Sequence, residues 1–457
     1  MDLVIRGGIA ITIGGRSSVN IGISDGRVQQ LGGAMHGDRE FDASGRYITP
    51  GGVDAHVHLT DLIRGDEDFH WSDDFESGTQ AAVIGGVTTV GNMSFAPRDG
   101  ALLEAIEQDS AEALRLAIAD YFFHPVLLRP TKENLACIEP LHAAGHTSIK
   151  FFLSFNNFDR HVQDFLSAMR IVKSNGGISL IHCEDAAIVD CCCTMLREAG
   201  KMDPRFYPDS RPIQSEVVAT HRAVGFAETT GCPCYIVHLA SVRALEACHE
   251  GRRRRVPVYV ETRPIYLHLT RQRFEEEDGA KYAGAPPLQD QSDVDALWPG
   301  IQFGIVDRLA ADHAPWMLAE KLDPAFDATT LRQGVADLET CMPMLYSAGV
   351  LGGRITLEQF VAVTSTNPAK LFGLYPQKGT IAVGGDADLL IWDDQKTQVI
   401  EGARMYSRSD YSPYDGFSVT GWPKWTFSRG TLAQEDGVVL ATKGRGQLIR
   451  RGPHRPI

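Results

Sequence analysis

The sequence lacks any apolar run that approaches the roughly 20 residues needed to cross a bilayer. Its N-terminus has no basic segment followed by an apolar core, which is the pattern of a secretory signal. Basic residues are outnumbered, since 44 Lys and Arg against 58 Asp and Glu give a net charge of -14. Because phosphate groups need a basic binding face, these features predict a cytoplasmic protein that binds neither membranes nor nucleic acids.

The sequence also lacks the patterns of two other protein classes. Its nine cysteines are odd in number and do not fit a disulfide framework in a chain of 457 residues. No glycine-rich phosphate loop of the Rossmann or P-loop type occurs. A disulfide-stabilised secreted protein and a nucleotide-binding protein are therefore both disfavoured.

Eight short apolar runs alternate with stretches of helical periodicity between about residues 51 and 375. This alternation is typical of a parallel sheet with helical crossovers. It predicts an α/β fold, a (β/α)8 TIM-like barrel at residues 51–375, with a doubly wound sheet as the main alternative. The expected strands are GVDAHVHL (52–59), VTTVGNMS (87–94), YFFHPVLL (121–128), SIKFFLS (148–154), ISLIHCE (178–184), CYIVHLAS (234–241), VPVYVET (256–262) and RLAADHA (308–314).

The two chain ends carry a different pattern. Residues 1–50 alternate short β-rich runs with turn signals, and similar runs return in residues 376–457. We therefore expect the two ends to pair into one small β-sandwich domain, with the barrel inserted between its parts and a C-terminal tail after it.

Polar residues near the ends of the apolar runs are the candidate functional groups. A buried histidine or charge is costly without a partner, and the C-terminal strand ends of a parallel barrel meet at one mouth. Since alternate side chains of a strand share a face, an HxH pair can point inward together. The candidates are His56, His58, Lys150, His182, His238 and Asp312.

Lys150 is unusual in this set because an ammonium group repels a metal ion. Desolvation and nearby metal charge would lower its pKa, and the neutral amine could take up carbon dioxide as a carbamate, N6-carboxylysine. Such a carbamate could bridge two ions. Two divalent ions, balanced by the carbamate, Asp312 and a bridging hydroxide, would keep about one positive charge to polarise a carbonyl.

Five motifs, in this order along the chain, resemble the cyclic amidohydrolases of the amidohydrolase superfamily, within them the dihydropyrimidinase and D-hydantoinase branch. They are GGVDAHVHL, IKFFLS, LIHCEDA, YIVHLAS and AADHAPW, and the resemblance extends to both chain ends. It implies ring opening of a hydantoin, dihydropyrimidine or cyclic imide by a hydroxide that bridges two zinc ions. It also implies a homotetramer.

The resemblance assigns roles to the same six residues. His56, His58, carboxylated Lys150 and Asp312 would hold one ion, and His182, His238 and the same carbamate the other. Asp312 would act as general base and then general acid. An Asp312→Asn variant is therefore expected to keep metal and lose most turnover.

The substrate-binding positions depart from that branch. Phe155 stands where the family usually has an oxyanion-donating tyrosine, Ala285 where it commonly has a serine, and Gln333 near its substrate-binding asparagine. We therefore expect an apolar or aromatic cyclic substrate other than plain dihydrouracil or hydantoin. Phe69, His70 and Trp71, in the loop after the first barrel strand, are further candidates for substrate contact.

Three alternatives stay open on the sequence alone. Dihydroorotases usually have Leu-Arg after the HxH pair, but here Leu59 precedes Thr60, which argues against a carboxylated substrate. Allantoinase resembles the flanking segments less well. A non-catalytic scaffold of the dihydropyrimidinase-related type would usually lack metal ligands, and all six are present.

Overall fold

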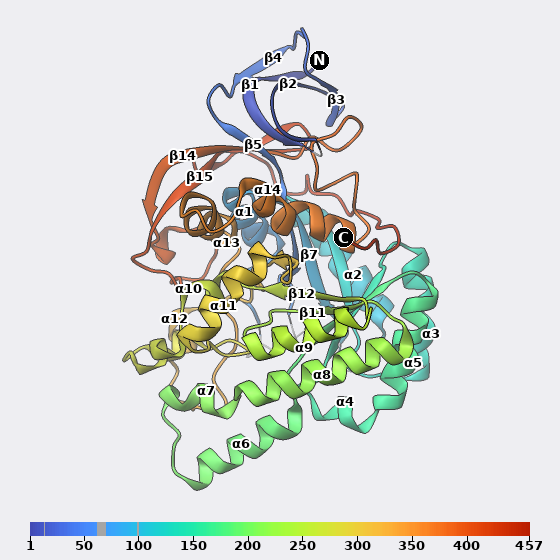
Figure 1. The fold of residues 1–457 in the computed structure, drawn as a ribbon, viewed down its shortest axis with the longest axis vertical. Coiled ribbons are helices and arrows are strands. Elements are labelled where there is room, and N and C mark those ends of the chain that lie inside the picture. The colour runs from blue at the N-terminus through green and yellow to red at the C-terminus, as the bar shows by residue number, and fades with distance from the viewer. Residues whose placement is uncertain (13, 62–69, 98–99) are drawn as a thin grey trace.

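The computed structural model describes residues 1–12, 14–61, 70–97 and 100–457. Each of the eight expected barrel strands is present, and they pair in chain order in one parallel sheet (Figure 1). The barrel predicted from the sequence is therefore confirmed. Its strands are β6 (Gly52–Val57), β7 (Val87–Phe95), β8 (Asp120–Val126), β9 (Ser148–Phe152), β10 (Ile178–His182), β11 (Cys234–Ile236), β12 (Val258–Thr262) and β13 (Arg308–Leu309).

The first and last barrel strands meet just beyond their regular ends. Val57 forms a parallel bridge with His313, and the backbone N–H of His58 donates to the His313 carbonyl at 2.9 Å. This contact nearly closes the barrel and brings the segments that carry His58 and Asp312 side by side.

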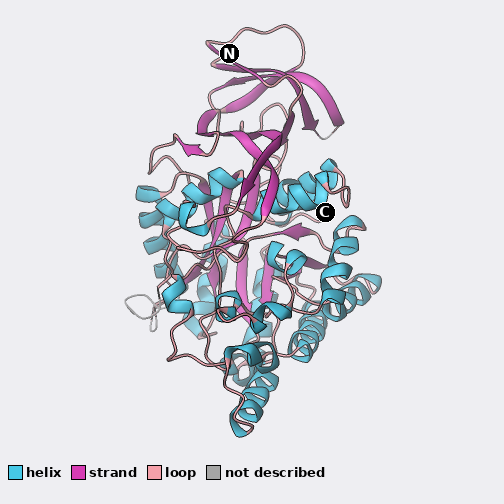
Figure 2. Cartoon of the chain, turned by 90° about the vertical axis from the view of Figure 1, so that its left-hand side faces the viewer, coloured by secondary structure: helices cyan, strands magenta, loops and turns pink. Residues whose placement is uncertain are grey.

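Helices cover the outside of the barrel (Figure 2). The first of them begins where Asp74 accepts hydrogen bonds from the backbone N–H groups of Glu76 and Ser77, and it ends at Gly86 with a φ of 92°. The longer helices are α1 (Phe75–Gly85), α2 (Leu102–Leu116), α3 (Lys132–Ala143), α5 (Val162–Ser174), α6 (Ala186–Glu198), α8 (Ile213–Thr230), α9 (Val242–Arg253) and α11 (Gln291–Gln302). Short helices are α4 (Asn156–Arg160), α7 (Tyr207–Ser210), α10 (Pro264–His268), α12 (Leu318–Lys321), α13 (Cys341–Leu345), α14 (Leu357–Val361) and α15 (Asn367–Leu371).

The two chain ends form a separate sheet beside the barrel, as expected (Figure 1). The join is antiparallel pairing between β5 and β14, in which Ile48 lies opposite Ile391. Hydrogen bonds link all of these strands into a single nine-stranded sheet around its own apolar core. Its strands are β1 (Leu3–Thr12), β2 (Gly15–Ser24), β3 (Arg27–Leu31), β4 (Arg39–Asp42), β5 (Tyr47–Pro50), β14 (Leu389–Val399), β15 (Ser418–Ser428), β16 (Thr431–Glu435) and β17 (Val438–Val439).

The last residues of the chain leave this sheet and return to the barrel. The backbone of Tyr121 in β8 accepts from Ile449 at 2.8 Å and donates to Gln447 at 2.9 Å. The domain boundaries at 50/51 and 375/376 stay a prediction. Among the described residues, no helix has the length and apolar character of a membrane span.

Candidate functional site

A cavity of about 120 Å3 lies at the C-terminal ends of the barrel strands, and all six candidate metal ligands line it. They come from five different strands or from the residues just after them, and all are buried. The convergence expected from barrel topology is therefore present in the structure. The six residues are His56, His58, Lys150, His182, His238 and Asp312.

Three of these residues form a compact candidate metal site. Potential ligand atoms of His56, His58 and Asp312 all lie within 4.8 Å of one another. The Oδ1 atom of Asp312 is 3.0 Å from Nε2 of His56 and 3.2 Å from Nε2 of His58. Burial lowers the pKa of His56 to about 4, so its ring is neutral near pH 7, which is the form that binds metals.

Glu261, the fourth residue of β12, contacts this cluster through His56. Its carboxylate lies 2.7 Å from Nδ1 of His56 and also accepts from Tyr235 Oη and from the backbone N–H of His238. Burial alone would raise the pKa of Glu261, but the facing His56 and Arg308 hold it at about 2. The bond to Glu261 fixes the His56 ring and leaves Nε2 for an ion.

Lys150 and His238 carry the polar atoms that fit a missing group best. Lys150 is completely buried, yet its Nζ has no hydrogen-bond partner among the described residues, and neither has Nδ1 of His238. Burial lowers the pKa of Lys150 to about 8. Unsatisfied buried donors and acceptors are rare in native proteins, so these two atoms are candidates to bind a metal ion or to carry a modification.

His182 is fixed by a buried ion pair. Its Nε2 lies 2.7 Å from Glu184 Oε2, and Glu184 accepts two hydrogen bonds from Arg211, at 2.9 and 2.7 Å. Burial would raise the pKa of Glu184, but Arg211 and His182 lower it to about 2. Glu184 therefore stays ionised and orients the His182 ring.

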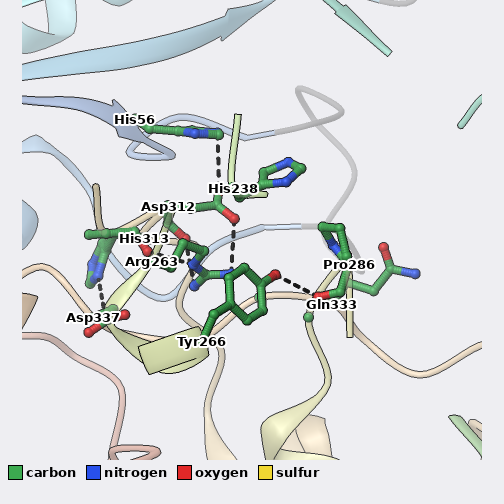
Figure 3. Close-up of polar contacts among 12 residues, drawn as sticks. His56, His238, Arg263, Tyr266, Pro286, Asp312, His313, Gln333 and Asp337 are labelled. Carbon is green, nitrogen blue, oxygen red and sulfur yellow. Dashed lines mark hydrogen bonds and ion pairs between the residues drawn. The ribbon is translucent and has the colours of Figure 1, made fainter. Parts of the chain in front are cut away.

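Asp312 is held on both sides of its carboxylate (Figure 3). Opposite the two histidines, its Oδ2 pairs with Nη1 of Arg263 at 3.0 Å. The same guanidinium donates to the carbonyls of Ala311 at 3.0 Å and of Asp312 itself at 3.3 Å. Burial raises the pKa of Asp312, but His56 and Arg263 outweigh it and hold that pKa well below its usual range.

Backbone strain accompanies two of these residues. Asp312 has a φ of 46° and His238 a φ of 37°, both in the left-handed region that non-glycine residues seldom adopt. Such strain persists where the surrounding structure imposes it, and the contacts of Arg263 with two successive carbonyls do so at Asp312.

The predicted substrate-binding residues are only partly brought together. Trp71, Phe155, Ala285 and Gln333 line the cavity. His70 is exposed and does not line it. Phe69 lies outside the described residues.

Aromatic rings make up one wall of the cavity. Phe95 packs on His58 with ring centroids 6.0 Å apart, and Phe152 packs on His182 at 5.3 Å. Phe155 packs against Phe152 with ring centroids 5.2 Å apart and is 42% exposed, so its ring lies toward the mouth. This wall offers apolar contact to a substrate.

Sequence reasoning missed the charged residues that hold the candidate ligands. Glu184, Arg211, Glu261 and Arg263 contact His182, His56 or Asp312, directly or through one carboxylate. A usable signal was present for two of them, because Glu261 and Arg263 interrupt the apolar segment VPVYVETRPIYL. A larger groove of about 660 Å3, at the N-terminal ends of β12 and β13, contains none of the predicted site residues.

Comparisons with known proteins agree with this geometry. The family model described as "Amidohydrolase family" matches residues 47–158 and 289–433. The chain belongs to the amidohydrolase family. The matched parts contain the candidate ligands His56, His58, Lys150 and Asp312, while His182 and His238 lie between them.

Relatives of this amidohydrolase match it over their full length. The chain is 34% identical to a D-hydantoinase of Ralstonia pickettii, over all of both chains. It is 35% identical to a D-phenylhydantoinase of Escherichia coli O1:K1 / APEC, over 100% of this chain and 99% of the other. The solved structure of a D-hydantoinase (dihydropyrimidinase) from Thermus sp. is 33% identical and superposes with a TM-score of 0.94 over 99% of both chains.

Proposed function

We propose that this protein opens the ring of a cyclic amide by hydrolysis, acting on a hydantoin, a dihydropyrimidine or a cyclic imide. The observation that carries the proposal is the convergence of six strand-end residues on one cavity. Support comes from the full-length likeness to proteins named for hydantoin hydrolysis.

We further propose that the site holds two divalent zinc ions. His56, His58 and Asp312 would hold one ion, His182 and His238 the other, and a carbamate on Lys150 would be shared by both. Lys150 Nζ has no hydrogen-bond partner among the described residues, which supports the carbamate. Carboxylation would turn this unsatisfied buried amine into a group bound to the metal ions. When bound, the ions would supply positive charge that polarises a carbonyl and lowers the pKa of water.

Asp312 is the residue proposed to move the proton. Its carboxylate would take a proton from the attacking water and return it to the ring nitrogen as the C–N bond breaks. Arg263 and the two histidines hold the carboxylate in one orientation for this transfer. Both halves of the reaction then use one group that need not reorient.

The cavity walls favour a neutral, partly apolar ring. Trp71, Phe95, Phe152 and Phe155 supply aromatic contact, and no arginine is among the described residues that line the cavity. A substrate carboxylate would thus lack a bidentate partner, which argues against dihydroorotate. Thr60 stands at the position where dihydroorotases usually have an arginine. It is a buried neutral residue that contacts Asp109, so this position supplies no cation for a substrate carboxylate.

Ring opening can be tested directly with a substrate panel. Metal-reconstituted, bicarbonate-supplemented protein would be assayed by proton release on dihydrouracil, hydantoin, 5-phenylhydantoin, allantoin, dihydroorotate, succinimide and phthalimide. We expect turnover of an aryl-hydantoin or imide to exceed that of dihydrouracil. No turnover of any ring by protein that holds two metal ions would contradict the proposed substrates. Protein that binds no metal and turns over no ring would favour the non-catalytic scaffold. The cytoplasmic location and the homotetramer stay predictions.

A further inference from the structure

Lys321, the last residue of α12, is a buried lysine that has no carboxylate partner among the described residues, and burial lowers its pKa well below the usual range. Its side chain is 1% exposed, and its Nζ donates to the carbonyls of Ala283 at 2.6 Å, Arg332 at 2.6 Å and Gly334 at 2.9 Å. Three carbonyls match the three protons of an ammonium group. Burying an amino group costs free energy unless its hydrogen bonds are replaced, and these three carbonyls replace them.

The three carbonyls belong to two segments that form one side of the cavity, residues 283–286 and 332–334, here called the wall segments. Ala285, Gln333 and Gly334 of these segments line the cavity. The wall segments contact each other through one backbone hydrogen bond, from Gly334 N–H to the Ala283 carbonyl at 3.0 Å. Lys321 adds the only described side chain that binds both segments.

Further hydrogen bonds hold three more carbonyls of the wall segments. Tyr207 Oη donates to Gly284 at 2.8 Å, and Tyr266 Oη donates to Pro286 at 2.6 Å (Figure 3). On the other segment, the indole N–H of Trp316 donates to the Gln333 carbonyl at 2.9 Å. These bonds occupy backbone groups that would otherwise compete for a ligand.

Three backbone groups of the cavity-lining wall residues are left over, and one of them is the Ala285 N–H, which donates no hydrogen bond within the described residues. Within the described part of the chain, the Ala285 carbonyl accepts no hydrogen bond and the Gln333 N–H donates none. A cyclic amide presents both an N–H donor and a carbonyl acceptor, so it is complementary to such a pair. The Ala285 carbonyl and the Gln333 N–H are one acceptor and one donor that belong to opposite wall segments.

We propose that Lys321 is a positioning residue for substrate binding, which sets the spacing of the Ala285 carbonyl and the Gln333 N–H by clamping the wall segments together. The proposal rests on the proposed cyclic-amide substrate. Lys321 also acts on the donor itself, since the Arg332 carbonyl that it binds belongs to the same peptide group as the Gln333 N–H. A hydrogen bond donated to that carbonyl polarises the peptide and strengthens its N–H as a donor.

The variant that tests this role is Lys321→Met, which keeps the apolar stem and removes all three donated bonds. Arg451→Met is a matched control, because Arg451 is also buried and donates to neutral oxygens, Ser148 Oγ and the Phe123 carbonyl, at the opposite end of the barrel. Lys321→Gln is the conservative variant, since its amide can still reach part of the carbonyl set.

With 5-phenylhydantoin as probe, we expect Lys321→Met to raise KM by about tenfold or more, the effect of losing one or two hydrogen bonds, and to change kcat much less. Lys321→Gln should give a smaller rise, and Arg451→Met should leave KM unchanged while lowering thermal stability. Two bound metals should persist in all three variants, because Lys321 touches none of the candidate ligands.

Hydrogen exchange supplies a readout that does not depend on turnover. In Lys321→Met, the amide of Gly334 should exchange faster than in the wild type, and in Arg451→Met it should not. Wild-type turnover with an unchanged KM in Lys321→Met, or unchanged exchange at Gly334, would overturn the clamp. A wild type that opens no ring of the panel would instead overturn the proposed function, and the substrate role of Lys321 with it.

Discussion

Replacing Asp312 with asparagine probes the proposed proton transfer with the smallest change of shape. Asparagine keeps the size of the side chain but loses its negative charge and its basicity. In the structure that charge faces His56 at 3.0 Å, His58 at 3.2 Å and Arg263 at 3.0 Å. The substitution therefore removes the proton acceptor while leaving both histidines and the amide oxygen in place.

The expected loss follows from the role of the group. A positioned acid or base contributes roughly 100- to 10,000-fold to a rate, which is about 3 to 5 kcal/mol of barrier. We expect kcat on 5-phenylhydantoin to fall by that factor. Because five of the six candidate ligands are untouched, the variant should still bind metal.

The assay is steady-state ring opening together with metal content by mass spectrometry. Asp337→Asn serves as the control, because Asp337 is a buried carboxyl in the same region that contacts Thr340 and Tyr414 and does not line the cavity. Burial raises the pKa of Asp337 to about 7, so asparagine should replace it with little effect on kcat. If Asp312→Asn keeps kcat within about tenfold of the wild type with its metals bound, the proton-transfer role is wrong.

Three further predictions concern other residues. Lys150→Ala should lower the metal content below two ions per chain and remove any dependence of activity on bicarbonate; two ions and full activity would contradict the carbamate. Phe155→Tyr adds a hydroxyl at the mouth and should raise kcat on hydantoin if an oxyanion donor is missing, by up to about 100-fold; an unchanged kcat would mean that the donor is supplied elsewhere. His146 is buried, and its burial, helped by Arg451, lowers its pKa to about 3, below the roughly 6.5 of an unfolded chain. The unfolded chain therefore gains a proton that the folded chain does not, so stability falls by up to about 1.4 kcal/mol per unit as the pH drops below about 6.5. Urea unfolding at pH 7 and pH 5 should show a smaller loss for His146→Gln than for the wild type, and equal losses would refute this.

The barrel and its candidate ligands could be predicted because both follow from local patterns. Short apolar runs between stretches of helical periodicity identify strands, and parallel strands in sequence order bring their C-terminal ends to one mouth. A histidine at the end of such a run, like His182, therefore has a predictable place. The pairing of the chain ends was predictable for the same reason, although their strands form one continuous sheet.

The supporting contacts depend on distances that no local pattern encodes. Arg263 directly follows strand β12, and only the closed barrel shows that it reaches Asp312, 49 positions along the chain. Lys321 ends the four-residue helix α12, and its three acceptors come from two separate loops. The left-handed φ of Asp312 likewise accompanies the contacts of Arg263 with the carbonyls of Ala311 and Asp312, which its residue type does not predict.

The most direct test of the central claim is a metal titration of ring opening. Metal-free protein in bicarbonate buffer would receive increasing zinc, and 5-phenylhydantoin hydrolysis would be followed at each ratio. The account predicts no activity without metal and a rise that levels off at two ions per chain. Activity in metal-free protein, or no activity on any ring of the panel at two bound ions, would contradict it.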